Sequence, residues 1–136
     1  MNNPVLKHKE ITDIILRSFY DVYNELGHGF LESVYENAMQ IVMEGFGLSV
    51  EKQKGISVCF RGTVVGQFMP DVIVNNSVII EIKAVENILP IHEAQLMHYL
   101  KATNIEVGIL LNFGKSPEFR RFAYDNLRKC IKRVSA

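Results

Sequence analysis

Two segments near the start of the chain carry apolar residues at the spacing of a helix. In residues 11–26 these are Ile11, Ile14, Ile15, Phe19, Val22, Tyr23 and Leu26. They recur every three or four positions and so share one side of a helix, which Gly27 and Gly29 would end. Residues 31–46 show the same spacing ahead of Gly47. We therefore predict two amphipathic helices at the start of the fold.

The pattern changes to short β-branched runs in the middle of the chain. They comprise residues 56–60, 63–69, 72–74 and 78–85. The first two runs are separated by Arg61-Gly62 and the last two by Asn75-Asn76, which are residues typical of tight turns. We expect these runs to form an antiparallel meander.

The remainder of the chain returns to helical spacing around one apolar run. Residues 91–102 predict a helix, residues 107–113 a buried strand, and residues 117–131 a final helix with a proline at its start. The order α-α-β-β-β-α-β-α indicates an α/β fold of the α+β kind, with helices packed on a mixed sheet. Because a helical crossover permits parallel pairing, we expect strand 107–113 to join the sheet in parallel.

Three charged residues, Asp71, Glu81 and Lys83, interrupt the apolar hairpin of residues 69–85. Side chains alternate across a strand, so Glu81 and Lys83 share one face. They lie about 7 Å apart along the strand, at a rise of roughly 3.3 Å per residue. The apolar residues between and before them take the other face and anchor the strand to the core.

The length of the turn decides whether Asp71 joins that face. A turn of Asn75-Asn76 alone would place Asp71 opposite Ile80, on the wrong side. A three-residue connection, Asn75-Asn76-Ser77, places it opposite Glu81, and Asn tolerates the left-handed backbone that such a loop needs. We predict the longer connection, or a bulge near Pro70 with the same effect.

Two carboxylates that converge repel one another unless a cation lies between them. Carboxylate oxygens suit a hard ion such as Mg²⁺ or Mn²⁺, which polarises a phosphoryl oxygen and lowers the pKa of a bound water. A neighbouring lysine then orients that water or stabilises the charge that develops on phosphate. Asp71, Glu81 and Lys83 thus predict metal-assisted phosphodiester hydrolysis. The alternative is an ion-paired, solvent-facing edge of an ordinary antiparallel sheet.

The composition fits one domain, residues 1–136, because a chain of this length that is 48% hydrophobic can bury a core. Fifteen basic residues balance fifteen acidic ones, so the net charge names no partner. Seven basic residues lie between positions 115 and 133, against Glu118 and Asp125, which gives this segment a charge of +5. That is compatible with a helix facing phosphate, or with a solvated helix face.

No apolar run approaches the length of a signal peptide core or a membrane span, so we expect a cytoplasmic protein with no membrane contact. Cys59 lies in an apolar run and reads as a core residue, and Cys130 is distant from it in sequence. The histidines and cysteines lack the spacing of zinc ligands.

Three motifs in order resemble those of a known nuclease group. Pro70-Asp71 followed by Glu81-Ile82-Lys83 resembles the motif of the PD-(D/E)XK nuclease superfamily. The stretch GFLESVY, residues 29–35, matches the G-x-x-E-x-x-Y signature of the GxxExxY family, which looks like a compact branch of that superfamily. The stretch QLMHY, residues 95–99, resembles the Q-x-x-x-Y motif of RecB-type exonucleases. The resemblance covers roughly residues 11–126 and implies a restriction-endonuclease-like core.

The resemblance assigns roles to particular residues. It implies that Glu32, Asp71 and Glu81 bind Mg²⁺ or Mn²⁺, that Ile82 lends its backbone carbonyl, and that Lys83 positions water. Gln95 and Tyr99, four residues apart on one helix face, would orient the substrate phosphate. For Glu32 the alternative is a favourable charge in the first turn of a helix.

Two further side chains stay open at this point. Tyr35 packs in the core or supports Glu32, and His92 reads as a surface residue rather than a catalytic base.

The resemblance implies a metal-dependent nuclease acting on nucleic acid, with DNA favoured over RNA. The alternative is a non-catalytic module of the same fold that binds nucleic acid or oligomerises, for instance as a homodimer. Intact Asp71, Glu81 and Lys83 favour the enzyme, because clustered acids repel phosphate unless a metal is present.

Overall fold

A mixed five-stranded sheet forms the centre of the computed structural model, which describes residues 6–129. In chain order the elements are α1 (Lys9–Leu26), α2 (Glu32–Gly45), β1 (Val50–Lys52), β2 (Ile56–Phe60), β3 (Thr63–Phe68), β4 (Val72–Val74), β5 (Val78–Lys83), α3 (Pro90–Ala102), β6 (Val107–Phe113), β7 (Pro117–Ala123) and a 3-10 helix (Asn126–Arg128). The strand order in the sheet is β1-β4-β5-β6-β7, and β2 and β3 form a separate two-stranded ribbon.

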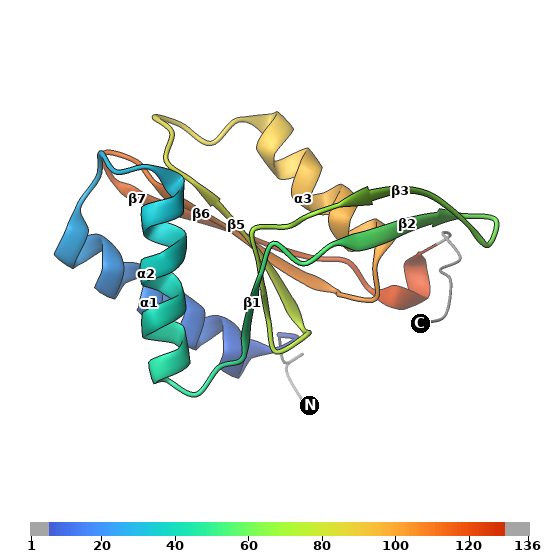
Figure 1. The fold of residues 1–136 in the computed structure, drawn as a ribbon, viewed down its shortest axis with the longest axis horizontal. Coiled ribbons are helices and arrows are strands. Elements are labelled where there is room, and N and C mark those ends of the chain that lie inside the picture. The colour runs from blue at the N-terminus through green and yellow to red at the C-terminus, as the bar shows by residue number, and fades with distance from the viewer. Residues whose placement is uncertain (1–5, 130–136) are drawn as a thin grey trace, which may run out of the picture.

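Helices cover both faces of the sheet (Figure 1). α1 and α2 pack on one face, against the side chains of Val78, Ile80 and Ile82 of β5 and their neighbours on β6. α3 packs on the other face, where Leu96 and Leu100 meet Ile79 and its neighbours. No helix in residues 6–129 is long and apolar enough to cross a membrane. The expected α/β class with a mixed sheet is therefore confirmed.

Most elements follow the apolar spacing. Three of the four predicted helices form, as α1, α2 and α3, and β6 covers residues 107–113 as expected. β6 is buried along its whole length and pairs with β5 in parallel, which the helical crossover predicted. Cys59 is buried, also as expected, and Cys130 lies outside the described residues.

The β4–β5 hairpin has the longer connection. Val74 pairs with Val78, and the Ser77 amide donates to the Val74 carbonyl at 2.9 Å. Asn75 and Asn76 both have a φ of 51°, the left-handed backbone that asparagine tolerates. This register places Asp71, just before β4, opposite Glu81.

The predicted helix at residues 117–131 is wrong. Residues 117–123 form β7, which pairs antiparallel with β6, and residues 130–131 lie outside the described chain. Phe119 and Phe122 are three apart, which is a helical spacing, but on a strand they point to opposite faces. Phe119 packs with the α1–α2 layer and Phe122 with the α3 layer, so both are covered without a helix.

The described part of the basic segment, residues 115–129, is consequently not an α-helix that faces phosphate. Arg120 forms ion pairs with Glu93 and Glu118, and Arg121 donates to the Lys7 carbonyl.

The expected single meander is also wrong. β2 and β3 pair only with each other within the described residues, and the chain leaves the ribbon at Met69-Pro70 before β4 begins. Pro70 has no N–H to donate, which favours a break in the ladder at this point. The sequence pattern also missed β1, a strand of only three residues, which pairs with β4.

Tyr35 fixes the loop that leads into α2. Its ring is fully buried and stacks on Phe113, with centroids 4.1 Å apart. Its hydroxyl donates to the Gly27 carbonyl at 2.6 Å and accepts from the Phe30 amide at 3.2 Å. Tyr35 is thus a packing and support residue, and it holds the α1–α2 loop rather than Glu32.

We predict that Tyr35→Phe lowers the free energy of unfolding by about 1–3 kcal/mol. The substitution keeps the ring stack but leaves the Gly27 carbonyl and the Phe30 amide without their partner. Urea unfolding of the variant measures the loss. Tyr20→Phe is the matched control, because Tyr20 is 38% exposed, and its stability is expected to change by less than about 0.5 kcal/mol. Equal stabilities of both variants would contradict the support role.

Candidate active site

The site lies where β4 and β5 separate. β4 begins at Val72, so the stretch of β5 from Glu81 to Lys83 has no partner strand on that side. In the hairpin register Ile82 stands opposite Pro70. The Asp71 side chain takes the place of the missing strand, because its Oδ2 accepts the Ile82 amide at 2.8 Å. Asp71 is thereby fixed against the backbone of the Glu81-Ile82-Lys83 segment.

Glu81 is a buried acid on the α3 face of the sheet. Its side chain lies on the same face as Ile79, it is 7% exposed, and its Oε1 has no hydrogen-bond partner. Burial, the hydrogen bond with Asp71 and the Asp71 charge, in that order of size, together raise the pKa of Glu81 to about 9. The Lys83 ammonium opposes this shift only in part. Glu81 is therefore protonated near neutral pH unless a cation replaces the proton.

Lys83 ends β5 and is partly exposed. Within the described chain it forms no ion pair with Glu81 or Asp71, although its charge lowers the pKa of Glu81. The ion-paired, solvent-facing edge that the sequence left open is therefore not what forms, because Glu81 is buried and forms no ion pair within the described residues. Asn112 of β6 holds the chain after Lys83 by accepting the Val85 amide at 3.0 Å and donating to the Val85 carbonyl at 2.9 Å.

Two acids on α2 approach the site from the other face. Glu32 is exposed, and its Oε2 accepts the Ala84 amide at 3.2 Å, directly after β5. Glu36, one turn further, is partly buried. Burial raises the pKa of Glu36, the charges of Asp71 and Glu32 add to this, and a hydrogen bond from Gln53 opposes it. The charge of Asp71 thus acts on the Glu36 carboxyl group.

The acids do not form one closed cluster. Within residues 6–129 no three His, Cys, Asp or Glu side chains are grouped closely enough to hold a metal ion. Asp71 and Glu81 meet as a pair, and Glu32 lies at the end of β5. The donors that are present still fit a hard cation, because Glu81 Oε1 is buried without a partner beside a second carboxyl group. The N–H and C=O of one strand residue point to the same edge, so the Ile82 carbonyl faces this opening too.

Gln95 and Tyr99 lie on α3, as the spacing predicted. Gln95 Nε2 donates to the Tyr99 hydroxyl at 2.6 Å. Burial raises the pKa of Tyr99, and the charge of Glu81 adds to the rise, so the hydroxyl lies within electrostatic reach of the acidic pair. His92 caps the start of α3 by accepting the Leu89 amide at 3.0 Å, which gives it a structural role.

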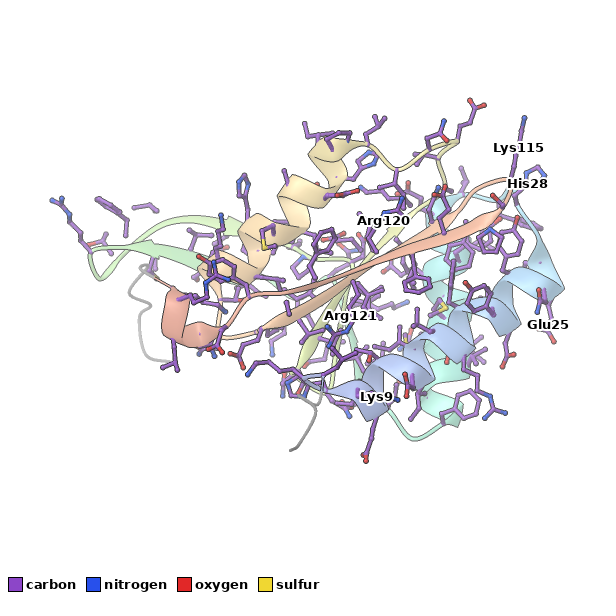
Figure 2. All side chains as sticks on the ribbon, turned by 180° about the vertical axis from the view of Figure 1, so that it is seen from behind. Lys9, Glu25, His28, Lys115, Arg120 and Arg121 are labelled. Carbon is purple, nitrogen blue, oxygen red and sulfur yellow. The ribbon has the colours of Figure 1, made fainter. Side chains whose placement is uncertain are left out.

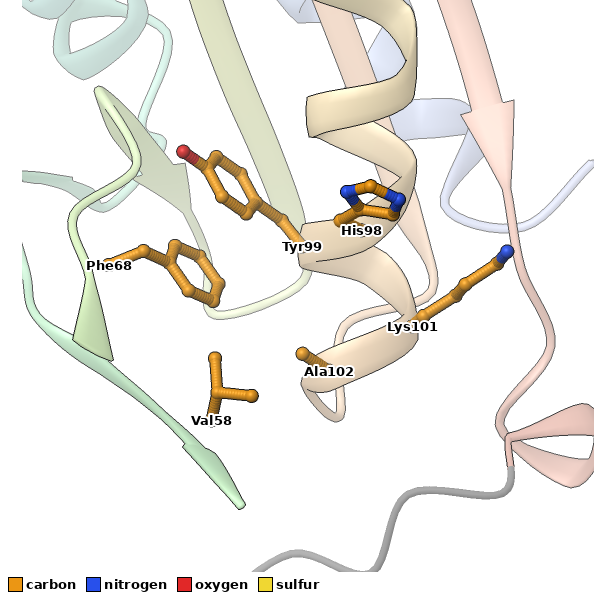
Figure 3. Close-up of a pocket in the computed structure, with 6 residues that line it drawn as sticks. All are labelled: Val58, Phe68, His98, Tyr99, Lys101 and Ala102. Atoms are coloured by element: carbon orange, nitrogen blue, oxygen red, sulfur yellow. The ribbon is translucent and has the colours of Figure 1, made fainter. Parts of the chain in front are cut away.

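An apolar cavity lies beside Tyr99, away from the acidic pair (Figure 3). The cavity has a volume of about 290 Å³, and it lies between the ribbon and the second half of α3. The rings of Phe68 and Tyr99 stack at its edge, with centroids 3.9 Å apart and planes 4° apart. Tyr99 therefore contacts the ribbon with its ring.

Sequence reasoning missed Glu36, Gln53 and Asn112. Glu36 follows Tyr35 directly, outside the motif, and only the packing of α2 against the sheet brings it near Asp71. Gln53 follows β1, and its backbone N–H donates to the backbone carbonyl of Asp71 at 3.2 Å. Asn112 had a usable signal, because a fully buried asparagine inside an apolar strand requires hydrogen-bond partners.

The raised pKa of Glu81 predicts how stability depends on pH in the absence of metal. Between pH 4.5 and about 9 the folded protein holds a proton that the unfolded chain has released, so stability falls as pH rises through this range. The slope contributed by this group is at most about 1.4 kcal/mol per pH unit. Glu81→Gln removes the group, and its unfolding free energy is expected to depend less on pH. Urea unfolding at pH 5, 7 and 9 in a metal chelator measures both proteins, and parallel pH profiles would contradict the shift.

Comparisons with known proteins agree with this geometry. The chain resembles the solved crystal structure of SSO0001, with a TM-score of 0.56 and 19% identity over 89% of this chain and 71% of that one. At this identity the likeness shows the fold alone, which is consistent with the restriction-endonuclease-like class. Among curated proteins no significant relative was found. The profile of the PD-(D/E)XK nuclease superfamily matches residues 9–122. The chain belongs to the PD-(D/E)XK nuclease superfamily.

Proposed function

We propose that the protein is a Mg²⁺- or Mn²⁺-dependent nuclease that hydrolyses phosphodiester bonds, and that it belongs to the GxxExxY branch of the superfamily. The observation that carries the proposal is the buried Glu81, which lies beside Asp71 with one oxygen unpartnered and Lys83 two residues further on the same face. A fold built only for stability gains nothing from such a group, because an unpaired buried acid is costly.

Four groups would hold the metal. Asp71 and Glu81 offer carboxylates, the Ile82 carbonyl faces the same opening, and Glu32 stands at the end of β5. Glu36 would act behind them, since its charge already couples to Asp71. A bound divalent ion supplies Lewis-acid polarisation of the phosphate and a water of lowered pKa. Binding requires Glu81 to release its proton, so metal affinity rises with pH.

Three further side chains would act on the substrate. Lys83 is partly exposed at the mouth of the site and is placed to orient water or to stabilise charge on the phosphate. Gln95 and Tyr99 are joined by a short hydrogen bond, so both donors are held in a fixed arrangement to orient the phosphate backbone. The substrate is nucleic acid, and we propose DNA rather than RNA and a cytoplasmic location.

Metal binding is tested by thermal unfolding. We expect Mg²⁺ or Mn²⁺ to raise the Tm of the wild type, because the ion takes the place of the proton on Glu81 in the folded protein and does not bind the unfolded chain. A hundredfold excess over Kd gives about 2.7 kcal/mol, or roughly 10 °C for a domain of this size. Asp71→Asn and Glu81→Gln are each expected to abolish the shift. Glu44→Gln, which removes an exposed acid remote from the site, controls for the loss of one charge.

Cleavage is then assayed with single- and double-stranded DNA, RNA and branched junctions. Activity that requires metal, Asp71, Glu81 and Lys83 is the expected result. Intact substrates with metal-saturated wild type would overturn the enzyme proposal.

The alternative function is an oligomerising module, and the ribbon favours it. Within the described chain β2 and β3 have no neighbour beyond each other, and Phe60, Val64 and Val65 are 57%, 47% and 61% exposed. A two-stranded ribbon is only marginally stable alone, and unpaired strand edges invite another chain. β3 carries no charged residue, so a second copy can pair with it across a two-fold axis without bringing like charges together. In this function the binding partner is a second copy of the chain, and the product is a homodimer.

We predict that Val65→Lys lowers the dimer fraction at micromolar concentration, because a charge on each copy would lie near the two-fold axis. Light scattering coupled to size exclusion measures the mass. Ile41→Lys is the control, since Ile41 is 73% exposed on α2, away from the ribbon. A wild type that stays monomeric at high concentration excludes the dimer.

A further inference from the structure

A second cavity lies next to the active site, at the ends of β5 and β6. It has a volume of about 250 Å³, and polar and apolar groups line it. Its walls come from the α1–α2 loop, from the chain that follows β5 and from the β6–β7 turn. His28 and Lys115 line it from two of these segments, and Glu86 lines it from the third. Figure 2 shows Lys115 and His28 together at one end of the molecule, away from Lys9.

The Lys115 side chain is available to bind a ligand. In the part of the chain from residue 6 to residue 129, the side chains of Lys83 and Lys115 alone among Lys and Arg form no ion pair, hydrogen bond or ring contact. The other cations are engaged with acids, carbonyls, amides or aromatic rings. The two free cations therefore lie at neighbouring points, one at the active site and one at this cavity.

The backbone beneath Lys115 is fixed. The Tyr23 hydroxyl lies 2.7 Å from the carbonyl oxygens of both Gly114 and Lys115, and donates to them. Gly114 packs so closely on the chain after β5 that an added Cβ would lie 2.6 Å from the Val85 carbonyl oxygen. The turn and the chain after β5 thus form one preorganised unit, which lowers the entropic cost of binding a ligand there.

The cavity begins directly after Lys83 along the chain. Ala84 and Val85, which line it, directly follow Lys83. Two residues of extended chain span roughly 7 Å, so the cavity begins within about one nucleotide of Lys83. A nucleic-acid strand that ran from Lys83 along the chain after β5 would reach this cavity, with His28 and Lys115, next.

We propose that this cavity is a phosphate subsite, in which Lys115 and His28 bind the backbone phosphate of the nucleotide next to the cleaved bond. The inference rests on the proposed nuclease function and adds where the uncleaved part of the strand is held. Lys115 contributes the charge, and the His28 imidazole contributes a hydrogen bond. Glu86 repels the phosphate, so removing its charge should strengthen binding, whereas removing Lys115 or His28 should weaken it.

The test is binding of a fluorescent single-stranded oligonucleotide, measured by anisotropy with Ca²⁺ in place of Mg²⁺ over a range of salt concentrations. Lys115→Ala is expected to weaken binding on the order of fivefold and to reduce the salt dependence by about one phosphate contact. His28→Ala is expected to weaken it less, and Glu86→Gln to strengthen it. Lys9→Ala is the matched control, because it removes the same charge from the far end of α1 (Figure 2).

The outcomes separate the two proposals. If the wild type binds and Lys115→Ala equals Lys9→Ala, the subsite is overturned and the nuclease proposal stands. If Glu86→Gln weakens binding, the subsite is overturned as well, because a purely structural role would explain that result. If the wild type binds no nucleic acid at all, both proposals fail.

Discussion

The hydrogen bond from the Ile82 amide to the Asp71 carboxylate is the interaction on which the site depends. The β4–β5 ladder ends at Val72, and Pro70, which stands opposite Ile82, has no N–H to donate to the Ile82 carbonyl. The Ile82 amide, beyond the end of the ladder, still needs an acceptor. Asp71 satisfies the amide with its side chain. Because a side-chain oxygen replaces a backbone carbonyl as acceptor, β4 and β5 can separate here while the segment from Glu81 to Lys83 stays ordered. The same bond holds the Asp71 and Glu81 carboxyl groups together.

The cost of this arrangement falls on Glu81. A pKa of about 9 instead of 4.5 means that the ionised form is disfavoured by on the order of 6 kcal/mol, a sizeable part of the stability of a small domain. The proton that Glu81 keeps in the absence of metal avoids this cost. In the proposed nuclease a divalent ion would do the same while leaving both carboxylates charged, and the unpartnered Glu81 oxygen would be one of its ligands.

The sequence predicted the parts of the fold that local rules determine. The length of the Asn75-Asn76-Ser77 connection determined on which face of the sheet Asp71 lies, and the helical crossover determined that β6 pairs in parallel with β5. The prediction failed where the same apolar spacing fits two structures. Phe119 and Phe122 fit one side of a helix, and they also fit a strand that is covered on both faces. The approach of Glu36 to Asp71 depends on how α2 packs, which no spacing encodes.

The two ends of the molecule carry different chemistry, so the two proposed functions do not exclude each other. Glu81 and Lys83 lie in the last part of β5, and Lys115 follows β6. The ribbon, whose two strands carry no charged residue, lies beside the other end of α3 (Figure 1). Tyr99 connects them, because its ring stacks on Phe68 of the ribbon while the charge of Glu81 acts on its hydroxyl. A second copy bound to β3 would leave the opening between β4 and β5 accessible. Association and catalysis are therefore separate questions for this fold.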